Sequence, residues 1–368
     1  MKQGKVDGVF LSLVLILNAV GLIMIFSANL YTSTLEGENG VVLALLKQIV
    51  QTGICIGMMF LVSMFDYRKW SNKKLGKCLL IISIFFLIVV YFTEPINGAR
   101  RWISIFGFTT LQPSEFTKLI SIIYLAGLLK REAYIYKKPK RFFMLIVLPM
   151  AIQLILIIFE PSYSAGVAVL AGILAVLYFA NVKLRYTYGY VLIGIVTLIG
   201  VFFTQAYRID RITGEVGYQV QQSLLAIGSG GWSGTGLGNG KQKYLFLPEL
   251  QNDFIFANIG EEGGVIGCLL VIILFVLLIH RGFSIGLSSR EPFGYYYTCS
   301  VMFLIAYHFM FNIMVAVGFM PVTGIALPFI SSGGSSSLMF CVMMGPILNL
   351  SKKVGNRRRM PKIRRTKQ

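Results

Sequence analysis

The sequence predicts an all-α polytopic membrane protein that crosses the bilayer about ten times. Hydrophobic residues make up 56% of the 368 residues, and charged residues make up only 13%. Because a soluble domain carries about 25% charged residues, this composition excludes a soluble globular protein. Ten apolar stretches are each long enough, at roughly 17–25 residues, to cross a bilayer as a helix. The predicted spans are 8–28, 41–65, 76–93, 114–130, 142–159, 164–181, 187–204, 254–280, 294–316 and 325–350.

The first span is predicted to be a membrane helix rather than a cleaved leader. Residues 8–28 are long enough to cross the bilayer and are not followed by a small-residue cleavage site. The five cysteines all lie in apolar stretches, and no two of them have the spacing of a metal site. We therefore expect free thiols that face lipid or the protein core. They are Cys55, Cys78, Cys268, Cys299 and Cys341.

The distribution of basic residues predicts the orientation. The loops 66–77, 130–141, 181–187 and 280–291, together with the two ends of the chain, hold 26 of the 34 Lys and Arg residues. Short cytoplasmic loops carry such an excess, so both termini are predicted to lie on the cytoplasmic side of the plasma membrane. The formal net charge of +19 is therefore largely an orientation signal.

The chain is predicted to contain one domain and a tail. Residues 1–351 would form a single ten-span membrane domain, and residues 352–368 a basic cytoplasmic tail with nine basic residues and no acidic one. Such a tail binds anionic lipid at the membrane surface. It has no aromatic residues between its charges and no fold of its own, so we do not expect it to bind nucleic acid.

Two segments on the outer side are predicted to do more than connect spans. Residues 205–253 form a large extracytoplasmic loop between spans seven and eight, and loops of that length are usually functional or disordered. This loop contains Trp232 and several other aromatic residues, which favours a function. Residues 94–113 contain Trp102 after a pair of arginines, and this pattern suits a short helix lying at the interface.

Asp253 is the candidate catalytic residue. It closes the 205–253 loop, and an apolar helix is expected to begin at the next residue. A lone carboxylate at the mouth of a membrane helix is costly to keep there, so it marks a functional site by default. Glu261 and Glu262 follow two turns later, and one of them could face the same cavity.

Six cations are expected on the outer face, where the orientation disfavours them. A cluster of this kind is explained by an anionic partner, and Arg and Lys suit a phosphate or diphosphate. Ordinary solvation and contact with lipid headgroups remain open as the alternative. The six residues are Arg100, Arg101, Arg208, Arg211, Lys241 and Lys243.

Glu115 and Lys118 are predicted to lie on one face of a helix. They are three residues apart, and Pro113 is well placed just inside the start of that helix. Inside a membrane the two charges should pair or face a polar cavity. Two interpretations stay open: a buried ion pair that locks the bundle, and a contact with substrate.

Two glycine-rich clusters carry weaker signals. Residues 228–241 look like a phosphate loop, but Thr235 and Gln242 break the required pattern. What remains is a backbone that can approach a ligand or another helix closely. Residues 329–338 contain glycines and serines that are expected to serve helix packing. His280 and His308 are too far apart to suggest a metal pair.

Several motifs together resemble the SEDS family (shape, elongation, division and sporulation proteins). They occur in the family's order over nearly the whole chain, and their form is closer to the FtsW and SpoVE branch than to RodA. The motifs are NGARRW at 97–102, QPSEFTK at 112–118, GYQVQQS at 217–223, AIGSGG at 226–231, GLGNG at 236–240, LPELQNDFIFA at 247–257 and MPVTGIALPFIS at 320–331.

The resemblance implies an inverting peptidoglycan glycosyltransferase, which polymerises lipid II into glycan strands outside the membrane. It also implies a class B penicillin-binding transpeptidase as partner, within the division, elongation or sporulation machinery. The family's essential acid falls on Asp253, which would take the proton from the attacking sugar hydroxyl. The undecaprenyl diphosphate leaving group needs cations aimed at its growing charge. The expected substrate-binding residues are Lys118, Arg101 and Lys241, followed by Arg100, Arg211, Glu115 and Trp102.

The same resemblance leaves the cofactor open. A divalent ion, Mg²⁺ or Mn²⁺, could bridge Asp253 and the diphosphate, whereas no organic cofactor is expected. Ser162, Asn252 and Ser332 stand where the family usually has Asp, Thr and Tyr, and the connection at 207–216 is short. These departures indicate a divergent branch or a specialised paralogue. A lipid II flippase and a non-catalytic scaffold that recruits a class B penicillin-binding protein are the alternative functions.

Overall fold

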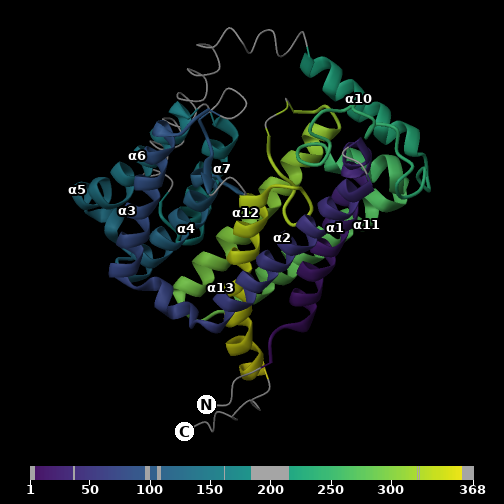
Figure 1. Cartoon of the computed structure of the whole chain (residues 1–368). Helices are drawn as coiled ribbons and strands as arrows, with labels where there is room; N and C mark the ends of the chain where they lie inside the picture. The colour runs from purple at the N-terminus through teal and green to yellow at the C-terminus, as the bar shows by residue number, and fades with distance from the viewer. Residues whose placement is uncertain are drawn as a thin grey trace.

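The computed structural model describes residues 5–35, 38–95, 100–105, 109–160, 162–183, 215–320, 322 and 324–358. These residues form a bundle of helices with one small β-hairpin (Figure 1). The longer helices are α1 (Gly8–Leu35), α2 (Glu38–Met64), α3 (Lys73–Val89), α4 (Pro113–Arg131), α6 (Leu148–Phe159), α7 (Tyr163–Phe179), α10 (Glu215–Gly230), α11 (Ile255–Leu287), α12 (Pro292–Ala316) and α13 (Gly334–Arg358). The short elements are η1 (Tyr67–Ser71), η2 (Val90–Phe92), η3 (Ile135–Lys137), α5 (Pro139–Phe142), the π-helical turn η4 (Phe143–Val147), β1 (Ile103–Ile105) and β2 (Thr109–Leu111).

The prediction of an all-α polytopic membrane protein is confirmed. Among the described residues, seven helices are long and apolar enough to cross a membrane. Helix α7 is apolar but shorter, with 17 residues, and α4 carries charged side chains at both of its ends. Both coincide with predicted spans. The predicted span 187–204 lies outside the described residues.

Helices α12 and α13 lie between two groups of helices (Figure 1). One group contains α3, α4, α6 and α7, and the other contains α1, α2, α10 and α11. Helix α12 packs against α4 and α7 on one side and α11 on the other, whereas α13 packs along α2. Helix α4 is buried over almost its whole length, so its polar side chains face protein instead of lipid.

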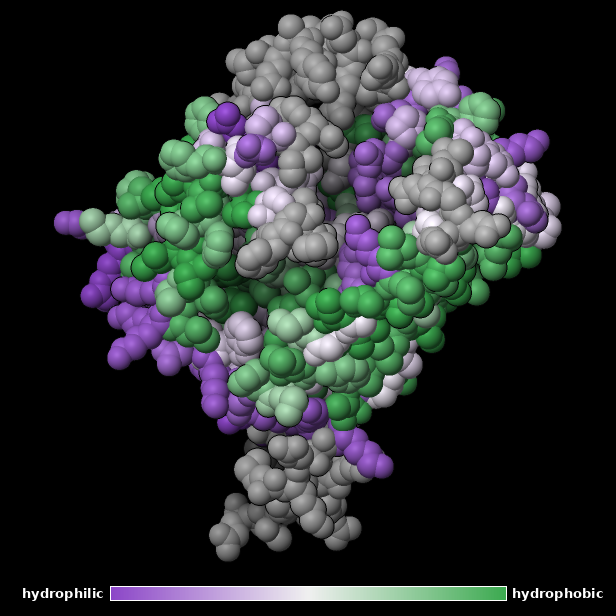
Figure 2. Space-filling view, viewed as in Figure 1, coloured by the Kyte–Doolittle hydropathy of each residue, from purple (hydrophilic) through white to green (hydrophobic). Residues whose placement is uncertain are grey.

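The surface agrees with a membrane location. Figure 2 shows a broad apolar band across the middle of the visible face, with hydrophilic residues gathered towards the two ends. Leu, Ile and Val side chains of α2 are exposed and contribute apolar surface. Contact of such a surface with water is unfavourable, whereas contact with lipid is not. The start of α1 and the last turns of α13 meet, because the backbone N–H of Asp7 donates to Ser351 Oγ at 3.1 Å.

Helix α11 is broken near its outer end at Gly264, whose φ of 62° and ψ of −162° suit only glycine. The break frees the carbonyls of Glu261 and Glu262, and these accept the N–H groups of Thr235 and Gly236 at 3.0 and 3.1 Å. In return, the N–H groups beyond the break donate to the carbonyls of Gly231 and Trp232. The expectation that the glycine-rich run permits close backbone approach to a helix is therefore confirmed.

Two predicted elements are wrong. The tenth span was expected at 325–350, but α13 begins only at Gly334, because Pro328 and the positive φ of Gly324 and Phe329 exclude a helix before it. The interfacial helix expected around Trp102 is replaced by the β1–β2 hairpin, in which Ile103 pairs with Leu111. Alternating β-branched residues favour a strand there.

Candidate active site

Asp253 is the last residue but one before α11, and its backbone is held from two directions. Its N–H donates to the carbonyl of Glu249 at 3.1 Å, in a turn that Glu249 opens with a φ of 55°. Its own carbonyl accepts a hydrogen bond from Asn312 Nδ2 at 3.0 Å. The carboxylate is partly exposed, and Oδ2 lies beside Gly324, where a Cβ would be 3.8 Å away. Asp253 therefore lies where the loop before α11 ends, as the sequence predicts.

The segment 324–333, here called the catalytic-side loop, frames Asp253. The N–H of Ser332 donates to the carbonyl of Gln251 at 2.9 Å, and Ser331 Oγ donates to the carbonyl of Asn252 at 2.6 Å. Ser331 Oγ also accepts from the N–H of Leu327 at 2.8 Å. The prediction that this glycine and serine cluster serves helix packing is thus wrong for its first residues, which hold the backbone next to Asp253.

Two residues of α12 that the sequence did not single out as site residues hold the other side of the catalytic-side loop. Asn312 Nδ2 donates to the carbonyl of Ile325 at 2.9 Å, in addition to that of Asp253. One turn earlier, His308 Nδ1 lies 3.4 Å from the carbonyl of Ala326. Their spacing of four residues within an otherwise apolar helix is a signal that could have revealed them.

Glu115 and Lys118 pair, as the sequence predicts. Lys118 Nζ lies 2.7 Å from Glu115 Oε1, and the lysine is 2% exposed. Nζ also lies 3.4 Å from His308 Nε2. The ammonium group therefore belongs to the same network of side chains as the catalytic-side loop. A lysine side chain this buried needs a partner of opposite charge, which Glu115 supplies.

Two other candidate cations, Arg100 and Arg101, hold backbone carbonyls of neighbouring segments. Arg101 Nε donates to the carbonyl of Glu160 at 3.3 Å, and Arg100 Nη1 donates to the carbonyl of Tyr91 at 3.1 Å. Trp102 is partly buried beside them, and its carbonyl accepts from Thr93 Oγ1 at 3.2 Å.

Lys241 and Lys243 belong to the glycine-rich loop that covers the kink in α11. The side chain of Lys241 is exposed, whereas Lys243 is buried and donates to the carbonyl of Gly238. Both arginines of the short connection, Arg208 and Arg211, lie outside the described residues.

Glu261 and Glu262 hold the glycine-rich loop and α1. Glu261 accepts the backbone N–H of Lys241 at 2.6 Å, and Glu262 accepts a hydrogen bond from Ser27 Oγ at 2.6 Å. Lys243 Nζ lies 3.9 Å from Glu262 Oε1. The structure gives both carboxylates structural partners, in the glycine-rich loop and in α1.

One family profile covers almost the whole chain. The profile of the cell cycle protein family that comprises FtsW, RodA and SpoVE matches residues 8–356. The chain belongs to this family, which is the SEDS family of the sequence motifs.

Its relatives match along almost their full length. Stage V sporulation protein E of Bacillus subtilis (strain 168) is 33% identical, over 95% of this chain and 98% of that protein. The probable peptidoglycan glycosyltransferase FtsW of Geobacter sp. (strain M18) is 31% identical, over 95% and 97%. A chain from a solved peptidoglycan synthase complex superposes with a TM-score of 0.75 and is 23% identical. The match covers 95% of this chain and 98% of that chain, which shows a shared fold.

This SEDS protein also buries an acid close to the predicted site cations. Glu160 directly follows α6 and is 1% exposed, and among the described residues neither of its carboxylate oxygens has a hydrogen-bond partner. Burial raises the pKa of Glu160 to about 8, against the opposing charge of Arg101. The carboxyl is therefore held neutral at the start of the turn that contains Ser162.

A metal site built by the protein alone is not found. Within the described ranges, no group of three His, Cys, Asp or Glu residues is placed to hold an ion. Asp253 could offer one ligand, and Mg²⁺ is often held by one or two carboxylates together with substrate phosphates. The residues present fit only an ion whose other ligands come from substrate or water.

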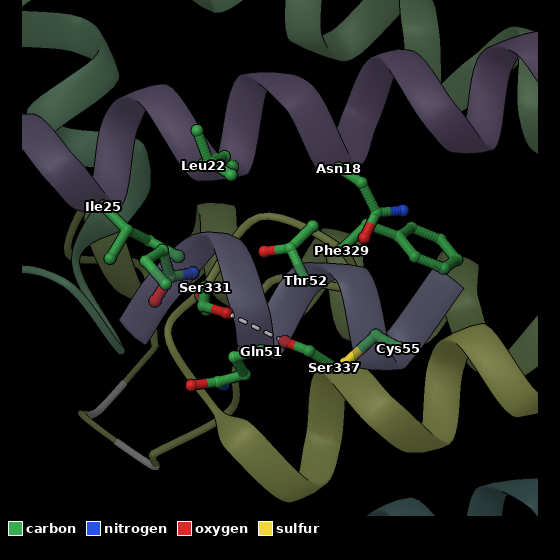
Figure 3. Close-up of a pocket in the computed structure, with 11 residues that line it drawn as sticks. Asn18, Leu22, Ile25, Gln51, Thr52, Cys55, Phe329, Ser331 and Ser337 are labelled. Carbon is green, nitrogen blue, oxygen red and sulfur yellow. Dashed lines mark hydrogen bonds between the residues drawn. The ribbon is translucent and has the colours of Figure 1, made fainter. Parts of the chain in front are cut away.

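A small pocket lies behind the catalytic-side loop, between α1, α2 and α13 (Figure 3). Its polar lining is neutral: Asn18 from α1, Gln48, Gln51 and Thr52 from α2, Ser331 from the catalytic-side loop and Ser337 from α13. Ser337 Oγ donates to the carbonyl of Ser331 at 3.0 Å, as Figure 3 shows. With no charged residue in its lining, the pocket is unsuited to a diphosphate.

Proposed function

We propose that the protein is an inverting peptidoglycan glycosyltransferase that polymerises lipid II into glycan strands on the outer face of the cytoplasmic membrane. Membership of the SEDS family supports the class of enzyme, and one relative is named as a probable peptidoglycan glycosyltransferase. The observation that carries the proposal is the placement of Asp253. Its backbone is fixed by α12 and by the neighbouring turn while its carboxylate stays partly exposed.

The chemistry needs one base in a fixed position. The hydroxyl of the acceptor sugar loses a proton as its oxygen attacks C1 of the donor sugar, and the carboxylate of Asp253 takes that proton. The bond from C1 to the diphosphate breaks on the opposite face of the sugar, so the configuration at C1 inverts. A single displacement of this kind requires no second carboxylate.

The leaving diphosphate carries negative charge that cations must stabilise. The cations proposed for this task are Lys118, Arg101 and Lys241, followed by Arg100 and Arg211. Glu115 sets the position of Lys118. Trp102 contacts the substrate at headgroup depth. Lys118 is buried, so binding of a diphosphate there requires access that substrate itself would open. A divalent cation, Mg²⁺ or Mn²⁺, would add positive charge between Asp253 and the diphosphate.

The partner we propose is a class B penicillin-binding transpeptidase, in a division, elongation or sporulation machinery. A chain of the same fold occurs in a solved peptidoglycan synthase complex, which supports an assembly of this kind. Both termini are proposed to be cytoplasmic, in line with the basic loops of that side.

The proposal is tested by incubating the purified full-length protein with labelled lipid II, alone and with a class B partner, with and without divalent ions. Glycan ladders are the expected product. A folded sample that binds its partner and forms no ladder under any condition would overturn the proposal. Transfer of labelled lipid II across a liposome bilayer would then indicate a flippase, and partner binding alone would indicate a scaffold.

A further inference from the structure

We infer that His308 is a positioning residue that couples the buried Lys118 to the backbone around Asp253. This inference rests on the proposed function and adds a residue to it. His308 is 2% exposed and lies in the middle of α12, between the Glu115–Lys118 pair on α4 and the catalytic-side loop.

The two neighbours of the imidazole fix its tautomer. Nε2 lies 3.4 Å from Lys118 Nζ, and an ammonium group can only donate, so Nε2 must accept. Nδ1 lies 3.4 Å from the carbonyl of Ala326, which can only accept, so Nδ1 must carry the proton. His308 is therefore a neutral ring that accepts from the lysine and donates to the loop.

Helix α12 holds two consecutive carbonyls of the catalytic-side loop through two side chains one turn apart. Asn312 donates to the carbonyl of Ile325 at 2.9 Å, and His308 donates to that of Ala326. Asn312 also donates to the carbonyl of Asp253 at 3.0 Å. A shift of the loop at Ala326 would therefore be transmitted to the peptide that places the catalytic carboxylate.

The ring itself has little room to move. Phe340 of α13 packs edge-on against His308, with ring centroids 5.0 Å apart, and Lys118 Nζ lies 6.0 Å from the centroid of the same Phe340 ring. The lysine, the imidazole and the loop therefore form one connected arrangement. A diphosphate that draws Lys118 towards itself would remove a hydrogen bond from His308, and the loop beside Asp253 would respond.

The inference predicts which substitutions preserve the coupling. In His308→Gln, the amide oxygen can accept from Lys118 and the amide N–H can donate to Ala326, so both hydrogen bonds remain. His308→Met fills a similar volume but supplies neither bond. His308→Asn is a milder variant whose shorter amide reaches at most one of the two partners. Tyr307→Phe is the matched control, because the buried Tyr307 hydroxyl has no hydrogen-bond partner in the part of the chain that the structure describes.

The first measurement is the rate of lipid II polymerisation by the full-length variants. We expect kcat to fall about ten- to hundredfold in His308→Met, because small misplacements of a catalytic group have effects of this size. KM should change much less, and His308→Gln should restore kcat to within a few fold of the wild type. Equal losses in the Gln and Met variants, or a change in KM alone, would overturn the inference.

The second measurement does not depend on activity. Hydrogen–deuterium exchange of residues 324–333 should be faster in His308→Met than in the wild type, Tyr307→Phe and His308→Gln, with His308→Asn between them. Unchanged exchange in the Met and Asn variants would overturn the inference whatever the activity. If exchange responds as expected but the wild type makes no glycan, the coupling stands and the proposed function fails.

Discussion

The two ends of the bundle use polar residues in different ways. At the end that holds Asp253, here named the Asp253 end, a serine and an amide donate hydrogen bonds to backbone carbonyls, and two ion pairs, Glu115–Lys118 and Lys243–Glu262, are buried. At the opposite end, where α1 starts and α13 ends, acids and bases pair directly and are partly exposed. These pairs are Arg281–Asp7, Lys353–Asp66, Arg68–Glu291 and Lys130–Glu291.

The difference has an energetic meaning. Exposed ion pairs contribute about 0–1 kcal/mol each and weaken with salt. Loss of a partner is costly for a buried charge and for irregular backbone inside a membrane, because no water replaces that partner. The opposite end is therefore expected to tolerate substitution, whereas substitutions at the Asp253 end are expected to reduce both stability and activity.

Removal of Lys118 should have the largest effect on stability. Lys118→Met leaves the carboxylate of Glu115 buried without its partner at 2.7 Å, which should lower the free energy of unfolding by about 3–5 kcal/mol. Polymerisation should be lost as well, because the diphosphate loses a cation. Adding Glu115→Gln to this variant should recover most of the stability but not the activity, as measured by thermal unfolding and glycan ladders. Equal stability of the single and double variants would contradict a buried pair.

Gly264→Ala should have the next largest effect on the free energy of unfolding. The φ and ψ of this residue are accessible to glycine alone, and a Cβ would overlap the backbone of Trp232 and Gly234. We expect a loss of about 2–4 kcal/mol in the free energy of unfolding. Gly263→Ala is the matched control, because nothing lies within 4 Å of the Cβ it would gain. A similar loss in the two variants would show that the kink is unimportant.

The buried carboxyl of Glu160 is expected to make the stability of the protein depend on pH. Its pKa is raised from 4.5 to about 8, so the folded state holds the proton more tightly than the unfolded state. The stabilisation is complete below pH 4.5 and is lost as the pH rises through about 8, by about 1.4 kcal/mol per pH unit between these limits.

The difference between the wild type and Glu160→Gln isolates this effect. Between pH 6 and 8 the wild type should lose about 2–3 kcal/mol more stability than the variant, as thermal unfolding would measure. Parallel pH profiles for the two proteins would mean that Glu160 is ionised in the fold.

The smallest effect is expected at the end where α1 starts and α13 ends. Arg68 is paired with Glu291 at 2.9 Å, but its side chain is 52% exposed. Arg68→Gln should therefore cost less than about 1 kcal/mol, and the cost should shrink in high salt. Unfolding measured at low and high salt tests this. A loss as large as that of Lys118→Met would remove the contrast between the two ends.

Much of the fold could be predicted because hydrophobic length and charge leave few alternatives in a membrane. Spans, the pairing of Glu115 with Lys118 and the position of Asp253 follow from local sequence. The start of α13 and the β1–β2 hairpin could not be predicted, since an apolar composition suits a span, a buried loop and a strand alike. Pro328 and the positive φ angles before Gly334 delay the start of α13. In the hairpin, β-branched residues such as Ile105 and Thr109 pair across the two strands.

The site was predicted only in part. Asp253 is a candidate because a charge stands out in an apolar chain, whereas Asn312 and His308 act on backbone carbonyls of a distant segment. Contacts between segments that are far apart in the sequence are set by packing, which local patterns do not contain. The roles of Arg100, Arg101, Trp102, Lys241 and Arg211 towards substrate stay predictions.

The most direct test of the account compares Asp253→Asn with Glu249→Gln in the polymerisation of labelled lipid II. The two acids belong to the same turn, and the carboxylate of Glu249 is engaged by Asn252 Nδ2 at 2.5 Å. We expect glycan ladders from the wild type and from Glu249→Gln, and none from a folded Asp253→Asn that still binds lipid II. Ladders formed by Asp253→Asn at an unchanged rate would contradict the assignment of Asp253 as the base.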